Sequence, residues 1–156
     1  MMIIIVVAIV GAGLITGLLF AFSNFVMRAL ADLPNDKGMY TMQRVNETII
    51  DHVFLVVFLG TPVLCSLIAI KSVLQLDEPG SLYLLLGALA YLIGPFAITI
   101  LFNVPLNNQL AKADLPVADK VWPIYQKQWQ RWNHMRTYIG VVSVLLLAAG
   151  LGTVQN

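Results

Sequence analysis

Few side chains in this sequence can take part in chemistry, and most of them lie at the ends of long apolar segments. His52 and His134 are its only histidines, and an imidazole can act as a general acid or base near neutral pH. Arg136 stands just before the last apolar segment, where a guanidinium could hold a phenolate, an enolate or a carboxylate. It could equally anchor the chain by reaching toward lipid phosphates, so both interpretations of Arg136 stay open.

Asparagines gather in the same stretches of sequence. A side-chain amide close to lipid is costly unless it is hydrogen-bonded. Each amide could therefore tie helix ends together, but as a set that converges with both histidines they indicate a polar, ligand-binding pocket. The asparagines concerned are Asn24, Asn46, Asn103, Asn107, Asn108 and Asn133.

Tryptophans accompany this polar set. Trp129 and Trp132 precede the last apolar segment, as does Trp122 further upstream. They could form an aromatic belt at the membrane interface or flat walls for an aromatic ligand. We include Trp129 and Trp132 among the predicted substrate-binding residues.

The two histidines could also bind a metal ion together with a nearby carboxylate such as Asp51 or Glu47. Their spacing matches no compact ligand motif. We therefore expect no metal, and a metal held by His52 and His134 is the alternative.

The elements that must position these residues are membrane-spanning helices. Hydrophobic residues make up 59% of the 156 residues and charged residues 11%, against about 25% charged residues in soluble domains. A bilayer core of about 30 Å needs roughly 20 apolar residues as helix. The predicted fold class is all-α, a four-helix transmembrane bundle in one domain, 1–156. Its spans are expected at about 1–27, 49–72, 81–103 and 134–154.

Two spans are predicted to extend beyond the bilayer as amphipathic helices, at about 36–48 and 117–133. The first should run without interruption into the second span, and the second into the fourth span. Pro105 should end the third span and turn the chain there. Gly13 and Gly17 align small side chains on one face of the first span, which predicts close helix packing.

Basic residues are distributed unevenly over the loops. Eight of the nine lie in the first and third loops, and only Lys71 borders the second loop. The positive-inside rule then places the first and third loops in the cytoplasm and both termini outside it. The sequence thus predicts a multi-pass integral membrane protein with its polar cluster near the inner leaflet.

The expected partners are the lipid bilayer and a hydrophobic small molecule, and a homo-oligomer is possible. The net charge of +1, with no basic stripe, argues against nucleic-acid binding. The spans lack embedded charges, which argues against an ion-coupled pump.

Two motifs resemble the anthrone oxygenase-like family of small four-span membrane proteins. One is Asn103-Val-Pro-Leu-Asn-Asn-Gln-Leu-Ala111, and the other is Trp129-x-x-Trp132-Asn-His-x-Arg-Thr137. Segments around Asn24 and Asn46 add to the similarity, which covers nearly the whole chain.

The resemblance implies oxidation of an anthrone to an anthraquinone, with dioxygen as co-substrate and no conventional redox cofactor. Removal of a proton from the carbon between the rings needs a base, for which we predict His134 or His52. Arg136 and the amides would then stabilise the developing oxyanion. The alternatives are a protein that binds or transports a lipophilic ligand, such as a dimeric exporter, and a structural accessory subunit.

Overall fold

The computed structural model describes residues 1–154, which are helical almost throughout and contain no strand. Four helices are long and apolar enough to cross a membrane: Met2–Ala31, His52–Leu74, Ser81–Ala111 and Leu115–Thr153. The predicted all-α bundle of four membrane helices is therefore confirmed.

The first and third membrane helices each change winding along their length. The first consists of α1 (Met2–Ala21), the π-helical segment η1 (Phe22–Val26) and α2 (Met27–Ala31). The third consists of α5 (Ser81–Tyr91), the π-helical segment η2 (Leu92–Asn103) and α6 (Val104–Ala111). The second is α4 (His52–Leu74). The fourth is α7 (Ala118–Val154), preceded by a short 3-10 turn η3 (Leu115–Val117).

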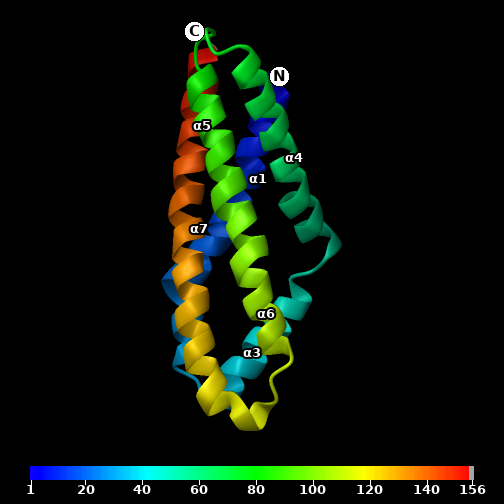
Figure 1. Cartoon of the computed structure of the whole chain (residues 1–156), viewed down its shortest axis with the longest axis vertical. Helices are drawn as coiled ribbons and strands as arrows, with labels where there is room; N and C mark the ends of the chain where they lie inside the picture. The colour runs from blue at the N-terminus through cyan, green and yellow to red at the C-terminus, as the bar shows by residue number, and fades with distance from the viewer. Residues whose placement is uncertain (155–156) are drawn as a thin grey trace.

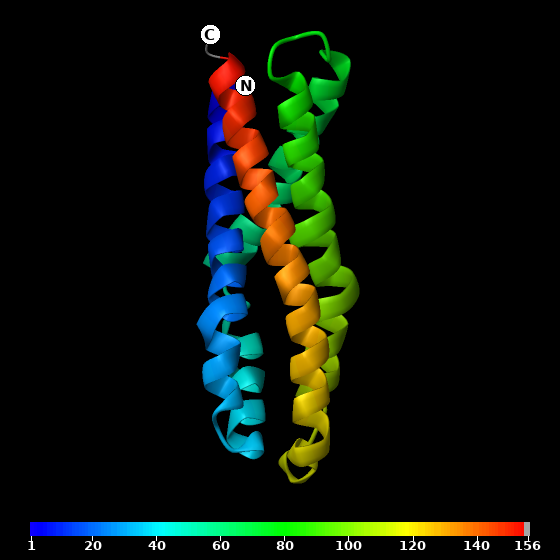
Figure 2. The ribbon, with the colours of Figure 1, turned by 90° about the vertical axis from the view of Figure 1, so that its left-hand side faces the viewer.

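The four helices pack as a closed ring of neighbours. Helix α1 packs against α4 and α7, and α5 packs against the same two helices (Figure 1). A view turned by 90° shows that α7 crosses α1 and diverges from it toward the end of the bundle that carries α3 (Figure 2). The two ends of the bundle consequently differ in how closely the helices approach.

The end near the termini is packed through glycines. A Cβ on Gly87 would lie 2.9 Å from the backbone nitrogen of Leu147, so α5 and α7 touch there. The buried Ser143 hydroxyl donates to the Gly87 carbonyl at 2.7 Å. The prediction of close packing at Gly13 and Gly17 was wrong, because a Cβ added to either would meet nothing within 4 Å.

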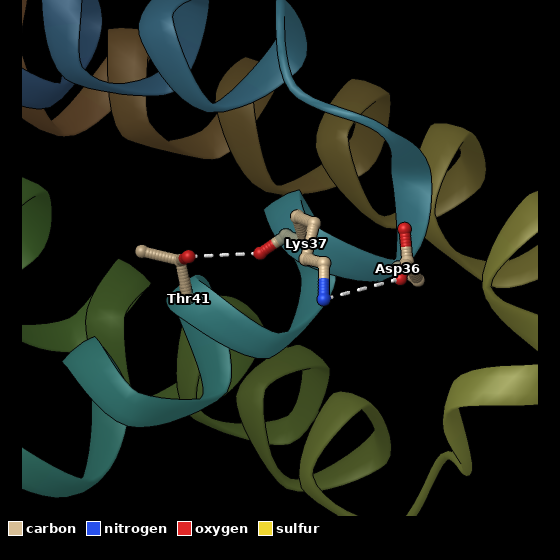
Figure 3. A network of polar contacts seen from close by, with 3 residues as sticks. All are labelled: Asp36, Lys37 and Thr41. Carbon is tan, nitrogen blue, oxygen red and sulfur yellow. Dashed lines mark hydrogen bonds and ion pairs between the residues drawn. The ribbon is translucent and has the colours of Figure 1, made fainter.

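Helix α3 (Asn35–Thr48) packs across the end of the bundle that lies away from the termini. Figure 3 shows its first turn, where Lys37 lies 3.8 Å from the Asp36 carboxylate and the Thr41 hydroxyl donates to the Lys37 carbonyl at 2.8 Å. The Gln43 amide donates to the carbonyls of Leu110 and Ala113, at 2.8 and 3.0 Å. These bonds hold α3 across the end of α6.

Helix α3 does not run into α4 as predicted. The chain leaves the helix after Thr48, and the Asp51 side chain accepts a hydrogen bond from the Phe54 amide at 2.7 Å. Asp51 is thus the N-cap of a new helix, which a side-chain acceptor at this position favours. The break lets α3 turn under the bundle while α4 continues upward (Figure 1).

Pro105 does not end the third membrane helix. The chain remains helical from η2 through α6 to Ala111, so Pro105 stands inside a continuous membrane helix. The proline removes one backbone donor, and it directly follows the π-helical winding of η2, in which hydrogen bonds reach five residues back. The asparagines after Pro105 therefore lie on a helix and not in a turn.

Candidate functional site

A partly open cavity lies where α3 passes beneath the bundle. It has a volume of about 230 Å³ and receives side chains from α1, α3, α4, η2, α6 and α7. Its wall is mostly apolar, with aromatic rings from Phe22, Phe54 and Phe58. The polar side chains that line it are Asn46, Thr99, Asn103, Asn107, Trp129 and Arg136.

Arg136 brings a positive charge into this apolar wall. Its side chain is 4% exposed, and its guanidinium lies 5.3 Å from the Trp129 ring centroid. Its Nη1 donates to the Thr99 hydroxyl at 2.9 Å, and its Nη2 donates to the Asn133 side-chain oxygen at 2.7 Å. Both acceptors are neutral, and within residues 1–154 no carboxylate forms an ion pair with it. No negatively charged side chain of residues 1–154 thus neutralises the guanidinium charge.

Buried polar atoms without partners surround the same cavity. The Nε of Arg136 and the side-chain oxygen of Asn103 have no hydrogen-bond partner. The Asn46 amide nitrogen is likewise buried without a hydrogen-bond partner. Such groups are costly to bury. A ligand acceptor oxygen would satisfy the two nitrogen donors, and a ligand hydroxyl would satisfy the Asn103 oxygen.

Asn107 joins two aromatic side chains at the edge of the cavity. Its side-chain oxygen accepts from the Tyr125 hydroxyl and from the Trp129 indole, both at 2.9 Å. Trp129 also packs on Phe22, with ring centroids 5.4 Å apart. These contacts fix the Trp129 ring beneath the guanidinium.

Asn133 lies behind Arg136 and does not line the cavity. It is fully buried, and its amide nitrogen donates to the Leu19 carbonyl at 2.9 Å and to the Ser23 hydroxyl at 2.8 Å. Its oxygen accepts from Arg136. Asn133, predicted as a substrate contact, thus lies outside the cavity lining and holds Arg136 against α1.

The histidines do not share this cavity, contrary to the prediction that they converge with Arg136. His52 is exposed at the start of α4 and lines none of the cavities described here. His134 is partly exposed on the outer face of α7, beside Ser23 and Asn24. Since α4 and α7 are not neighbours in the ring, a metal held between these histidines has no geometric support. Within residues 1–154, no three His, Cys, Asp or Glu side chains form a metal-binding group.

Three other predicted substrate contacts also lie outside the cavity. Asn24 and Asn108 are exposed, and Asn24 lies on the His134 side of the bundle. Trp132 stacks on Phe102 with ring centroids 3.8 Å apart, at the outer edge of η2 and α7. Of the predicted set, the structure brings Asn46, Asn103, Asn107, Trp129 and Arg136 together.

Sequence reasoning missed Thr99 and the phenylalanines of the wall. Thr99 donates to the Pro95 carbonyl and accepts from Arg136, so it lies between a proline of η2 and the buried charge. A signal was available, since Pro95, Thr99 and Asn103 recur every four residues on one helical face. Phe54 and Phe58 carried no such signal within an apolar span.

A family model described as anthrone oxygenase matches residues 52–146 of the chain. The matched region includes η2, α6 and most of α7, and so contains Thr99, Asn103, Asn107, Trp129 and Arg136. Searches of curated proteins and of solved structures found no match.

Proposed function

Because this chain belongs to the anthrone oxygenase family, we propose that it is a membrane-embedded oxidoreductase that acts on a hydrophobic, anthrone-like molecule in the cavity beneath Arg136. Dioxygen is the co-substrate, and no conventional redox cofactor takes part. The observation that carries the proposal is the buried Arg136 guanidinium, uncompensated by any carboxylate of residues 1–154 and with a free Nε, in an aromatic wall. A charge in such a place favours an anion.

The proposed ligand is a flat ketone that can become an enolate. Its rings would lie among Phe22, Phe54 and Phe58, and its oxygen would accept a hydrogen bond from the Nε of Arg136. A positive charge that meets the oxyanion in a dry site lowers the energy of the enolate much more than that of the ketone. Arg136 would therefore promote ionisation of the substrate.

The reaction balances with dioxygen alone. The enolate gives one electron to dioxygen, and the resulting carbon radical and superoxide combine to a peroxide at the carbon between the rings. Loss of water from the peroxide leaves the second ketone, so one anthrone and one dioxygen give one anthraquinone and one water. The cavity lining contains no histidine or carboxylate, so we propose that the first proton leaves to water at the mouth of the cavity.

A test is oxygen uptake by protein reconstituted in lipid discs, with a panel of anthrones. Arg136→Gln should lower the rate by about 100-fold, the order expected for losing an oxyanion contact. Arg131→Gln is the matched control, because Arg131 is exposed on the same helix and should change the rate less than about twofold. Equal rates for wild type and Arg136→Gln would contradict the proposed mechanism.

A second function is supported by the same absence of a base in the cavity lining. The protein would then bind or carry the ionised ligand without oxidising it. Tight binding of an anthrone by wild type, weakened by Arg136→Gln and without oxygen uptake above the rate in empty discs, would favour this function.

We further propose that the ends of the bundle face opposite sides of the membrane, with α3 and the start of α7 in the cytoplasm. The support is the excess of basic residues in the first and third loops. Labelling of single cysteines introduced at Lys37 and at Asp77 in intact cells tests this orientation. Only the cysteine at position 77 should react with a reagent that does not cross the membrane.

A further inference from the structure

A second polar surface lies on the other face of α7 and has no part in the proposed reaction. A depression of about 450 Å³ separates η1 and α2 from the first half of α7. Its lining includes Arg28, Lys127 and His134, with the amide side chains of Asn24, Gln126 and Gln130. No acidic side chain of residues 1–154 lines it. The surface therefore offers mainly hydrogen-bond donors and positive charge.

One residue of this lining carries an unused donor. The Gln126 amide nitrogen is buried and has no hydrogen-bond partner within residues 1–154. Arg28 uses one of its donors on the Asn24 carbonyl, which holds the guanidinium beside η1. A ligand with several acceptor oxygens would satisfy the remaining donors.

A smaller depression continues from this one toward the centre of the apolar span. It has a volume of about 220 Å³ and shares Ser23, Asn24 and His134 with the first. Phe20 and Tyr138 form its sides and are 52% and 71% exposed, so an apolar chain could lie along them. The polar part thus lies at the end of the span and the apolar part alongside it.

We infer that the two depressions together bind one anionic phospholipid, with its phosphate among Arg28, Lys127 and Gln126 and an acyl chain along Phe20 and Tyr138. Basic pockets between membrane helices suit such headgroups, and each basic side chain near the surface adds measurable attraction. A zwitterionic lipid fits less well, because its own cation would meet Arg28 and Lys127. The site is independent of the cavity beneath Arg136.

Native mass spectrometry of the detergent-purified protein with added phosphatidylglycerol or phosphatidylcholine tests this site. Wild type should retain one phosphatidylglycerol in preference to phosphatidylcholine. Arg28→Gln with Lys127→Gln should weaken phosphatidylglycerol binding by about tenfold or more. The conservative pair Arg28→Lys with Lys127→Arg should restore it.

The matched control is Lys112→Gln with Lys120→Gln, which removes two exposed charges from the same end of the bundle. This variant should bind phosphatidylglycerol within about twofold of wild type. An equal loss in both double variants would mean general attraction of charge and would overturn the site. With wild type alone, glycerol 3-phosphate in excess should leave the lipid bound, and its displacement would identify a site for soluble phosphates instead.

Discussion

The two faces of α7 around residue 134 differ in almost every physical respect. On one face Arg136 is 4% exposed, stacks on Trp129 and lines a largely apolar cavity with aromatic walls. On the other face His134 is partly exposed and borders an open polar depression. Side chains two positions apart on a helix are rotated by about 200° about its axis, so His134 and Arg136 lie on opposite faces of α7. The two faces therefore separate the buried guanidinium from the imidazole of His134.

Asn133 is the residue through which the buried face can be altered most sharply. Asn133→Asp would place a carboxylate 2.7 Å from Arg136 in a nearly isosteric side chain, at the loss of the amide donor to the Leu19 carbonyl. An ion pair would then neutralise the guanidinium, and affinity for an ionised ligand should fall by about tenfold or more. Isothermal titration with a phenolic anthraquinone measures this loss.

The matched control for that change is Asn108→Asp, because Asn108 is exposed and outside the cavity. It adds the same negative charge near the same end of the bundle and should leave the affinity almost unchanged. A similar loss in both variants would show that total charge, and not the state of Arg136, governs binding.

The packed end of the bundle offers a second contrast. Gly87→Ala would place a Cβ 2.9 Å from the Leu147 backbone, which cannot move aside, and should cost about 1 to 3 kcal/mol. Gly13→Ala meets nothing within 4 Å and should be neutral or slightly stabilising. Thermal unfolding in one detergent compares the two, and equal melting temperatures would mean that the helices do not approach as closely as described.

The histidines should show the smallest effect. His52→Ala combined with His134→Ala removes both imidazoles from outside the cavity, so oxygen uptake with an anthrone should stay within about twofold of wild type. The pH profile should also keep its shape. A loss of tenfold or more would return proton transfer to a histidine and contradict the division between the two faces.

The sequence was sufficient for the fold class because length and hydropathy define membrane helices strongly. It was less informative about breaks within them. Asp51 looks like one more polar residue between α3 and α4, and only its capping bond to Phe54 shows that the helix restarts there. Pro105 looked like a terminator, although the chain stays helical through it, directly after the π-helical segment η2.

The sequence predicted only some of the residues that line the cavity. Asn103, Asn107, Trp129 and Arg136 were recognised as polar or aromatic side chains at the ends of spans, and all four line the cavity. Residues that are close in sequence can lie on different faces of one helix. His134 was therefore wrongly expected to face the same cavity as Arg136. Thr99 was overlooked because a threonine inside an apolar span commonly bonds its own helix.

The central claim is that Arg136 stabilises an anion in the cavity, and the ionisation of a bound ligand tests it most directly. A monohydroxy anthraquinone changes its visible absorption when its phenol ionises, so a pH titration in lipid discs gives the pKa of the bound phenol. Wild-type protein should lower that pKa by about 1 to 3 pH units relative to empty discs, and Arg136→Gln should not. An equal phenol pKa in wild type, Arg136→Gln and empty discs would contradict the account.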